Sequence, residues 1–233
     1  IYPLMKDYSD NCCPLCGFNE PKRYFEDKTR HYLSCPVCGL VFVPEAFHLT
    51  AEAEKGEYDL HKNDPEDPGY RRFLSRLSRP LLERLGPRQK GENRQKGLDF
   101  GCGPGPALYQ LMEEQGHTMD LYDPFFARDT DLLSDSYDFI TATEVVEHFR
   151  RPDREFDLLF RLLRKGGWLG IMTKMVLDKN AFSHWHYIRD LTHVCFYRRA
   201  TFSYIAQKYN ASLTFIPDDV ILLRKKLRKG VDA

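Results

Sequence analysis

Three glycines at alternate positions follow an acidic residue at the end of an apolar run, in residues 98–105 (LDFGCGPG). This order predicts a strand, a tight turn and the start of a helix. Glycine permits a positive φ there and lets a ligand lie against the bare main chain. The helix start supplies free N–H groups and a partial positive charge. The turn therefore suits the adenosine and amino-acid parts of a nucleotide-like cofactor, with Asp99 placed to meet an ammonium group or an ordered water.

A second carboxylate follows at the spacing that a βαβ unit requires. The apolar segment 119–122 ends in Asp123-Pro124, and the two strand ends are about twenty residues apart. A carboxylate at the tip of the second strand is where open α/β sheets hold ribose hydroxyls. Phosphate-bearing NAD is the less favoured ligand, because the third glycine comes one residue too early for the G-x-G-x-x-G fingerprint.

Residues 144–148 (EVVEH) combine two carboxylates with an imidazole. On a helix, Glu144, Glu147 and His148 occupy positions i, i+3 and i+4 and share one face. That face is expected in the cleft above the carboxyl ends of the strands. The three side chains are suited to a divalent metal ion, and a fourth ligand could come from residues 190–194 (DLTHV). In the alternative hypothesis they shape a pocket without metal, and His148 or His193 is the general base.

The segment 182–197 is dense in functional side chains, and we expect it to cover the site of the acceptor. Its candidate catalytic residues are Tyr187, Asp190 and His193, together with His148 from the earlier motif. Trp185 is expected to pack within an aromatic lid rather than to take part in chemistry.

Two C-P-x-C-G motifs, at 13–17 and 35–39, have the spacing of a zinc ribbon. Each turns the chain so that two thiolates point at one ion, and zinc accepts four such soft ligands tetrahedrally. Two disulfides are the alternative, disfavoured because the sequence shows no export signal. Cys12 is the spare thiol, and Cys102 and Cys195 are expected to be ordinary small residues. The predicted zinc ligands are Cys13, Cys16, Cys35 and Cys38.

The sequence divides into a ribbon (1–45), an acidic connector (46–69) that its prolines mark as a boundary, and a larger domain (70–233). Apolar periodicity predicts a helix over 70–85 that Pro80 kinks or splits. Residues 125–136 are expected to hold a loop and a short third strand. The other expected helices are 106–115, a helix around 156–163 and 201–209. The other expected strands are 23–25, 31–33, 40–43, 139–141, 168–172, and a closing hairpin of 213–216 and 220–223.

Composition narrows the class of protein. The formal net charge is zero and 29% of residues are charged, which fits a folded soluble protein and argues against a whole-protein electrostatic grip on nucleic acid. The basic runs in 71–96 and 224–229 lack interleaved aromatic residues, so solvated faces are favoured over an RNA-binding surface. No apolar run is long enough to span a membrane, and a cytoplasmic location is expected.

The glycine turn, Tyr122-Asp123-Pro124 and residues 137–144 (YDFITATE) and 163–169 (LRKGGWL) together resemble class I S-adenosylmethionine-dependent methyltransferases. The resemblance covers roughly residues 70–225. It implies an α/β fold, a Rossmann-like seven-stranded sheet with helices on both faces, preceded here by the small zinc ribbon. It also implies that the glycines line the methionine side of S-adenosylmethionine and that Asp123 takes the ribose. The implied cofactor contacts are Asp99, Gly101, Cys102, Gly103, Gly105, Tyr122, Asp123, Thr143 and Glu144.

Residues 144–148 with the distant His193 also resemble the E-x-x-E-H plus His pattern of metal-dependent O-methyltransferases, which include small-RNA 2′-O-methyltransferases and quinone-pathway enzymes. Carried over by position, this implies that Mg²⁺ or another divalent ion is bound by Glu144, Glu147, His148 and His193. The expected activity is methylation of a hydroxyl or other nucleophilic atom of a small or carrier-linked metabolite. The alternatives are an rRNA or tRNA methyltransferase whose ribbon docks RNA, and a non-catalytic cofactor-binding protein whose ribbon contacts a protein partner.

Overall fold

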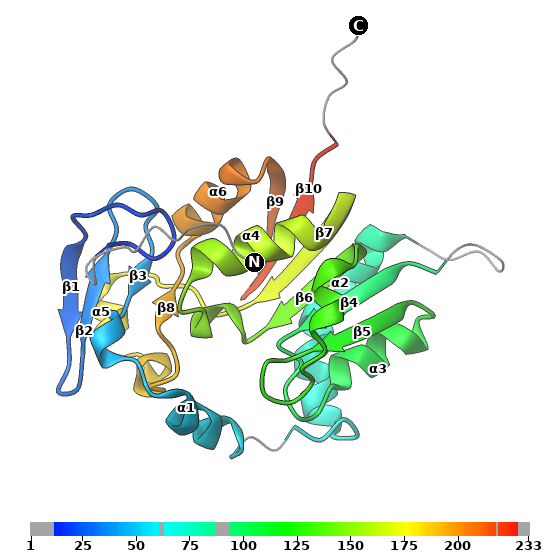
Figure 1. Ribbon diagram of the computed structural model, residues 1–233, viewed down its shortest axis with the longest axis horizontal. Coiled ribbons are helices and arrows are strands. Elements are labelled where there is room, and N and C mark those ends of the chain that lie inside the picture. The colour runs from blue at the N-terminus through cyan, green and yellow to red at the C-terminus, as the bar shows by residue number, and fades with distance from the viewer. Residues whose placement is uncertain (1–11, 61–62, 87–93, 218, 228–233) are drawn as a thin grey trace, which may run out of the picture.

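The centre of the computed structural model, which describes residues 12–60, 63–86, 94–217 and 219–227, is a six-stranded sheet (Figure 1). The strand order is β5-β4-β6-β7-β10-β9. The first four run parallel, and β10 runs antiparallel to both of its neighbours. The strands are β4 (Lys96–Phe100), β5 (Thr118–Tyr122), β6 (Tyr137–Thr143), β7 (Leu163–Met172), β9 (Ala211–Ile216) and β10 (Val220–Lys225).

Helices cover both faces of this sheet because successive strand residues point to opposite sides. Phe139 of β6 packs in one apolar cluster with the leucines of α2 (Pro68–Leu85) and α3 (Ala107–Glu114). Its neighbour Ile140 packs in another cluster, with residues of α4 (Pro152–Leu162) and α6 (Arg199–Lys208). The Rossmann-like α/β class expected from the sequence is confirmed.

A second, smaller sheet joins two distant parts of the chain. Its order is β1-β2-β3-β8, with every pair antiparallel. Strands β1 (Lys22–Glu26), β2 (His31–Ser34) and β3 (Val41–Phe42) belong to the N-terminal ribbon. Strand β8 (Cys195–Phe196) lies between β7 and α6 in the sequence and runs beside β3 in space (Figure 1). The ribbon is therefore hydrogen-bonded to the segment that carries the candidate catalytic residues.

Two expectations about the larger domain are corrected. Among the described residues the main sheet has six strands rather than seven, because 125–136 contributes the 3₁₀ helix η2 (Thr130–Ser134) in place of a strand. Pro80 lies inside α2 without splitting it. Leu77 and Leu81, on either side of Pro80, are fully buried against the sheet, so tertiary packing holds the helix together across the missing N–H.

The acidic connector is more ordered than a simple boundary. It contains the 3₁₀ helix η1 (Glu45–Phe47) and the helix α1 (Ala51–Tyr58), which Thr50 caps by accepting from the Ala53 N–H at 3.3 Å. The remaining short elements are η3 (Val146–His148), α5 (Lys179–Ser183) and η4 (His186–Arg189). Within the described residues, every helix is too short or too polar to cross a bilayer.

Candidate functional site

A cleft of about 730 Å³ opens at the carboxyl ends of β4, β5 and β6. This volume is typical of sites for small molecules and cofactors. The residues that line the cleft include the glycine turn, Glu144, His148, Asp190 and His193. The candidate cofactor residues therefore share one cleft with three of the four candidate catalytic residues, as the sequence predicts for an open α/β sheet, whereas Tyr187 is buried and is not among the lining residues.

Neighbouring atoms lie so close to the glycine turn that a side chain would not fit at Gly101 or Gly105. Gly101 has φ +77°, and a Cβ there would lie 2.5 Å from Val145 Cγ2. A Cβ on Gly105 would lie 1.9 Å from the main-chain oxygen of Asn63, which the connector brings against the turn. Gly103 has φ +63°, a conformation that residues with a side chain adopt at a cost. Each glycine is thus required by geometry before any ligand is considered.

Asp123 fastens the glycine turn to the end of β5. Its Oδ2 accepts from the Gly103 N–H at 3.0 Å, and its Oδ1 accepts from Phe125 N at 2.8 Å and Phe126 N at 3.1 Å. The carboxylate is 7% exposed and lines the cleft. A ribose contact would use the lone pairs that remain after these three bonds.

Asp99 lies at the end of β4 and is buried in the cleft wall. Thr141 Oγ1 donates to its Oδ1 at 2.7 Å. Burial raises the pKa of Asp99 to about 6, with the nearby Asp123 carboxylate adding to the effect against the Thr141 hydrogen bond. A cation that entered the cleft beside Asp99 would restore its charged form.

The other predicted cofactor residues also line the cleft. The Tyr122 carbonyl accepts from Gly101 N at 2.8 Å and from Cys102 N at 3.3 Å, which closes the turn. Cys102 is buried beside it. Thr143 ends β6 with a buried hydroxyl that has no hydrogen-bond partner among the described residues. A polar ligand in the cleft would satisfy that hydroxyl.

The 144–148 motif is not the helical face that its spacing predicts. Glu144 adopts φ +52°, in the left-handed region, and only the following residues form the 3₁₀ helix η3. Glu144 therefore does not share a helical face with Glu147 and His148. The metal-ligating atoms that lie within 4.8 Å of one another belong to Glu147, His148 and His193. Three of the four predicted ligands are therefore brought together, and Glu144 stands beside them.

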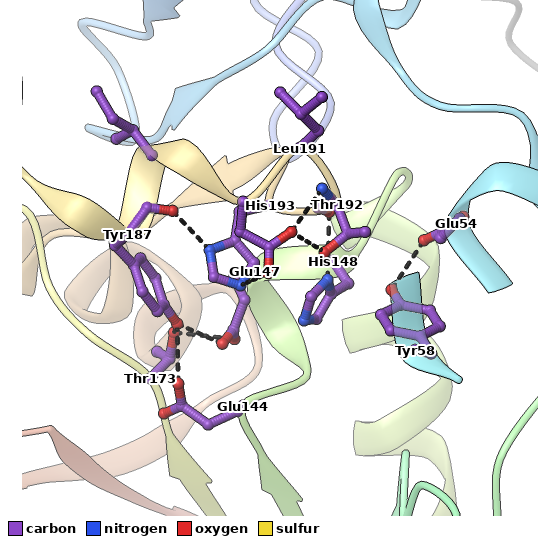
Figure 2. Close-up of polar contacts among 12 residues, drawn as sticks. Glu54, Tyr58, Glu144, Glu147, His148, Thr173, Tyr187, Leu191, Thr192 and His193 are labelled. Carbon is purple, nitrogen blue, oxygen red and sulfur yellow. Dashed lines mark hydrogen bonds and ion pairs between the residues drawn. The ribbon is translucent and has the colours of Figure 1, made fainter. Parts of the chain in front are cut away.

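A main-chain carbonyl contacts Nδ1 of each of the two imidazoles. His193 Nδ1 lies 2.8 Å from the Tyr187 carbonyl, and His148 Nδ1 lies 3.2 Å from the Thr192 carbonyl (Figure 2). A carbonyl only accepts, so each Nδ1 carries a proton. The two rings are 4.8 Å apart between centroids. His193 Nε2 lies 3.6 Å from Asp190 Oδ2.

Tyr187 links the carboxylates of Glu144 and Glu147. Its hydroxyl contacts Glu147 Oε1, lies 3.3 Å from Glu144 Oε2 and lies 3.2 Å from Thr173 Oγ1 (Figure 2). Thr173 also donates to Glu147 Oε2 at 3.0 Å. Burial raises the pKa of both Glu144 and Glu147, and the proximity of the two carboxylates adds to this for Glu147. A cation or a shared proton would relieve this pair.

Asp190 lies beside His193 at the cleft wall. Its Oδ1 accepts from the N–H and the hydroxyl of Thr192, at 2.9 and 2.5 Å, and its Oδ2 lies 3.6 Å from His193 Nε2. Burial acts to raise the pKa of Asp190, but the Thr192 donors and the positive charge of a protonated His193 outweigh it, so the pKa is lowered. Asp190 thus places a carboxylate beside the His193 imidazole.

Sequence reasoning missed the residues that the connector supplies. Glu54, Tyr58 and Asn63 line the cleft opposite the sheet. The Tyr58 ring meets the His148 ring edge-on at 5.3 Å, and its hydroxyl donates to Glu54 at 2.9 Å (Figure 2). Thr173 was missed as well. No motif marks these positions, and the apolar and acidic pattern of the connector indicates only an exposed segment.

The four predicted zinc ligands form a separate cluster in the ribbon. Their sulfur atoms all lie within 4.8 Å of one another, with Cys13 and Cys38 at 3.5 Å and Cys16 and Cys35 at 3.4 Å. None of them is in a disulfide. Gly17 and Gly39, the last residues of the two motifs, take positive φ values, and their N–H groups donate to the carbonyls of Cys13 and Cys35 at 2.9 Å. Each knuckle thus turns its two thiols inward.

The chain is similar to solved structures of methyltransferases. An O-methyltransferase family protein from Burkholderia thailandensis is 14% identical, with a TM-score of 0.49; the match covers 79% of the present chain and 64% of that chain. Magnesium protoporphyrin IX methyltransferase from Synechocystis PCC 6803, solved with bound SAH, is 12% identical, with a TM-score of 0.46; the match covers 78% of the present chain and 97% of that one. No curated protein matches the sequence.

The family is established by sequence. Residues 70–214 match the methyltransferase domain family, and this stretch is well over half of the chain. It runs from the start of α2 to β9 and includes the glycine turn, Asp123, the 144–148 motif and His193. The chain therefore belongs to the methyltransferase domain family and is an S-adenosylmethionine-dependent methyltransferase.

Proposed function

We propose that this methyltransferase methylates a hydroxyl, or another nucleophilic atom, of a small or carrier-linked metabolite. The observation that supports the proposal is the shared cleft, which is lined by the glycine turn together with His148 and His193. A hydroxyl is a weak nucleophile until its proton is removed. A base beside the methyl donor is therefore the feature that hydroxyl methylation needs most.

In the proposed arrangement, the main chain at the glycine turn holds the methionine part of the cofactor. Asp99 pairs with its ammonium group, and Asp123 accepts from its ribose hydroxyls. The contact set further includes Cys102, Tyr122, Thr143 and Glu144, which line the same cleft. Methyl transfer is an in-line displacement, so the chief tasks of the site are alignment and exclusion of water.

Two hypotheses describe the deprotonation step. In the first, Glu147, His148 and His193 hold a divalent ion, a donor set of two imidazoles and one carboxylate that such ions accept. The bound ion would lower the pKa of the acceptor hydroxyl and orient its oxygen. In the second, His193 Nε2 takes the proton directly and Asp190, 3.6 Å away, stabilises the resulting imidazolium. In both hypotheses, Tyr187 keeps Glu147 in place.

We also propose that the ribbon (1–45) holds one structural zinc ion through Cys13, Cys16, Cys35 and Cys38. The four-sulfur cluster and the absence of disulfides among these cysteines support this. The acidic connector (46–69) and the methyltransferase domain (70–233) complete the proposed division of the chain. A unit as small as the ribbon has too little core of its own, so bound metal would supply much of its stability.

The acceptor class can be tested directly with S-adenosylmethionine labelled in its methyl group. An extract of the source cells is separated into metabolites, RNA and protein, and each fraction is incubated with the enzyme. Label in the metabolite fraction is the expected result. Label in RNA alone would replace the proposal by the RNA-docking alternative. No binding of S-adenosylmethionine by calorimetry would favour a non-catalytic protein.

The deprotonation hypotheses differ in their metal requirement. Paramagnetic resonance of Mn²⁺ added to the zinc-loaded protein measures whether a second ion binds, and how tightly. The metal hypothesis expects binding that His193→Ala abolishes and that His186→Ala, at an exposed neighbouring position, leaves intact. If the wild type binds no Mn²⁺ and transfers methyl groups in the presence of a chelator that spares the zinc, the direct-base hypothesis stands.

A further inference from the structure

Arg30 is a buried arginine of the ribbon whose guanidinium binds the methyltransferase domain (70–233), which is called the catalytic half below. It lies in the turn between β1 and β2 and is only 2% exposed. A guanidinium carries five N–H donors, and all five are used. Nε donates to Tyr32 Oη at 2.9 Å. The other four reach main-chain carbonyls of a single hexapeptide: Ile188 and Asp190 at 2.8 Å, His193 at 3.0 Å and Leu191 at 3.1 Å.

A buried charge is tolerated only when it is paired and fully hydrogen-bonded. Here four carbonyl dipoles surround the guanidinium. The fifth partner extends the network, because Tyr32 Oη in turn donates to Asp27 Oδ2 at 2.7 Å. Asp27 Oδ1 also accepts from Arg30 N at 2.9 Å. The ribbon thus supplies both the cation and the anion that balances it, while the catalytic half supplies only main-chain oxygens.

The hexapeptide 188–193 carries the side chains of the proposed site. Asp190 and His193 line the cleft, and the Thr192 carbonyl orients His148. Arg30 binds the carbonyls of four of these six residues, whereas the Thr192 carbonyl is left for His148. The guanidinium therefore holds the main chain of 188–193 in place, while the side chains of Asp190 and His193 line the cleft.

We propose that Arg30 is a positioning residue for this catalytic segment, and that the ribbon acts as a brace for the active site. Two further links support this. Strand β3 pairs with β8 immediately after the hexapeptide, and the Val43 N–H donates to the Val194 carbonyl at 2.9 Å. The assignment of His193 and Asp190 to catalysis rests on the proposed function; the mechanical role of Arg30 does not.

Substitution of Arg30 by lysine tests the brace. An ammonium keeps the charge but gathers its three donors at one point, so it cannot span four carbonyls. Hydrogen exchange read by mass spectrometry reports on the amides of Thr192, His193 and Val194, which are bonded to Asp190 and Glu147. We expect exchange in the peptide covering 188–194 to rise by about tenfold or more, with the glycine turn unchanged.

Arg198→Lys is the matched control. Arg198 also joins the two parts of the molecule, with its Nη1 donating to Ser34 Oγ at 3.0 Å and to the Gly39 carbonyl at 2.8 Å, but it does not contact the hexapeptide. Hydrogen exchange of residues 188–194 in Arg198→Lys should match that of the wild type. Zinc content and binding of S-adenosylmethionine are measured in parallel, and Arg30→Lys should keep both. Tyr32→Phe removes the hydroxyl that accepts from Arg30 Nε, donates to Asp27 Oδ2 and lies 3.3 Å from the Ile188 carbonyl, and it should give a smaller rise in exchange because the four guanidinium–carbonyl bonds remain.

A spectroscopic reading separates positioning from general destabilisation. In protein labelled with ¹⁵N-histidine, the ring nitrogen signals of His193 should report the Nδ1–H form in the wild type and in Arg198→Lys. Arg30→Lys should give a mixture of the two tautomers and a slower transfer of methyl groups to the metabolite fraction. Unchanged exchange and unchanged tautomers in both Arg30→Lys and Tyr32→Phe would overturn the proposal. If Arg30→Lys raises exchange in 188–194 but even the wild type transfers no methyl groups to the metabolite fraction, only the proposed function is overturned.

Discussion

Asp99→Asn is expected to stabilise the empty protein while weakening its hold on the cofactor. Asp99 is buried, and its pKa rises from the ordinary 3.8 to about 6 in the folded state. The folded protein therefore binds this proton more tightly than the unfolded chain does. The contribution of Asp99 to the free energy of unfolding falls as pH rises from about 4 to about 6, and the loss is complete above that range.

The magnitude follows from the two pKa values. At 1.36 kcal/mol per pKa unit, the ionised Asp99 costs at most about 3 kcal/mol at pH 7. Asparagine carries no charge and keeps an oxygen that can accept from Thr141 Oγ1. The variant should therefore gain up to this amount at pH 7 and little at pH 4. The lost ion pair with the cofactor ammonium should weaken binding by about ten- to a hundredfold.

Urea unfolding of zinc-loaded, cofactor-free protein between pH 4 and 8 measures the first effect, and calorimetry with S-adenosylmethionine measures the second. Asp131→Asn, at an exposed acid outside the cleft, is the control and should change neither. If Asp99→Asn is less stable than the wild type at pH 7, or binds the cofactor equally well, the argument is refuted that the buried Asp99 carboxylate destabilises the empty protein and pairs with the ammonium group of the cofactor.

Three other substitutions probe the turn, the ribbon and the buried network. Gly105→Ala should weaken S-adenosylmethionine binding by about tenfold or more in calorimetry, since its Cβ would meet the Asn63 oxygen at 1.9 Å and displace the turn. Cys38→Ser should lower the zinc content by elemental analysis from one per chain and reduce the melting temperature, because the ribbon loses a metal ligand. Tyr187→Phe should lower the free energy of unfolding in urea by about 1–3 kcal/mol, because buried Glu147 loses a donor.

Each of these has a matched control elsewhere in the chain. Gly56→Ala adds a Cβ with no atom within 4 Å and should leave cofactor binding intact. Cys102→Ser lies outside the sulfur cluster and should leave the zinc content unchanged. Tyr109→Phe removes a hydroxyl from a part of α3 that the buried network does not reach, and should leave stability near that of the wild type. Equal effects in a variant and its control would remove the corresponding explanation.

Local patterns in the sequence were sufficient for the frame of the molecule. The glycine turn, the ribbon strands and the closing hairpin of β9 and β10 lie where the spacing of glycine, cysteine and apolar residues predicts them. Each of these features depends on a few consecutive residues, whose backbone preferences and side-chain alternation are visible in one short window. The fold class follows, because strands alternating with helices imply a parallel sheet.

Features that depend on distant partners were not visible. The helical spacing of 144–148 suggested one shared face, but Glu144 adopts a left-handed conformation ahead of the 3₁₀ helix that holds Glu147 and His148. The network of Arg30 joins residues about 160 positions apart, and no periodicity encodes such a contact. Pro80 lies inside α2 without splitting it for the same reason, since burial against the sheet outweighs a local helix penalty.

The pairing of β3 with β8 bears on what happens to the protein without its first 45 residues. Val41 and Phe42 lie opposite Phe196 and Cys195, and all four side chains are almost fully buried. A shortened chain would present β8 as an unprotected edge flanked by aromatic surface, the kind of strand that pairs with other copies and aggregates. The catalytic half of this enzyme is therefore unsuited to an independent existence, and its N-terminal ribbon cannot be exchanged for another module without a replacement strand.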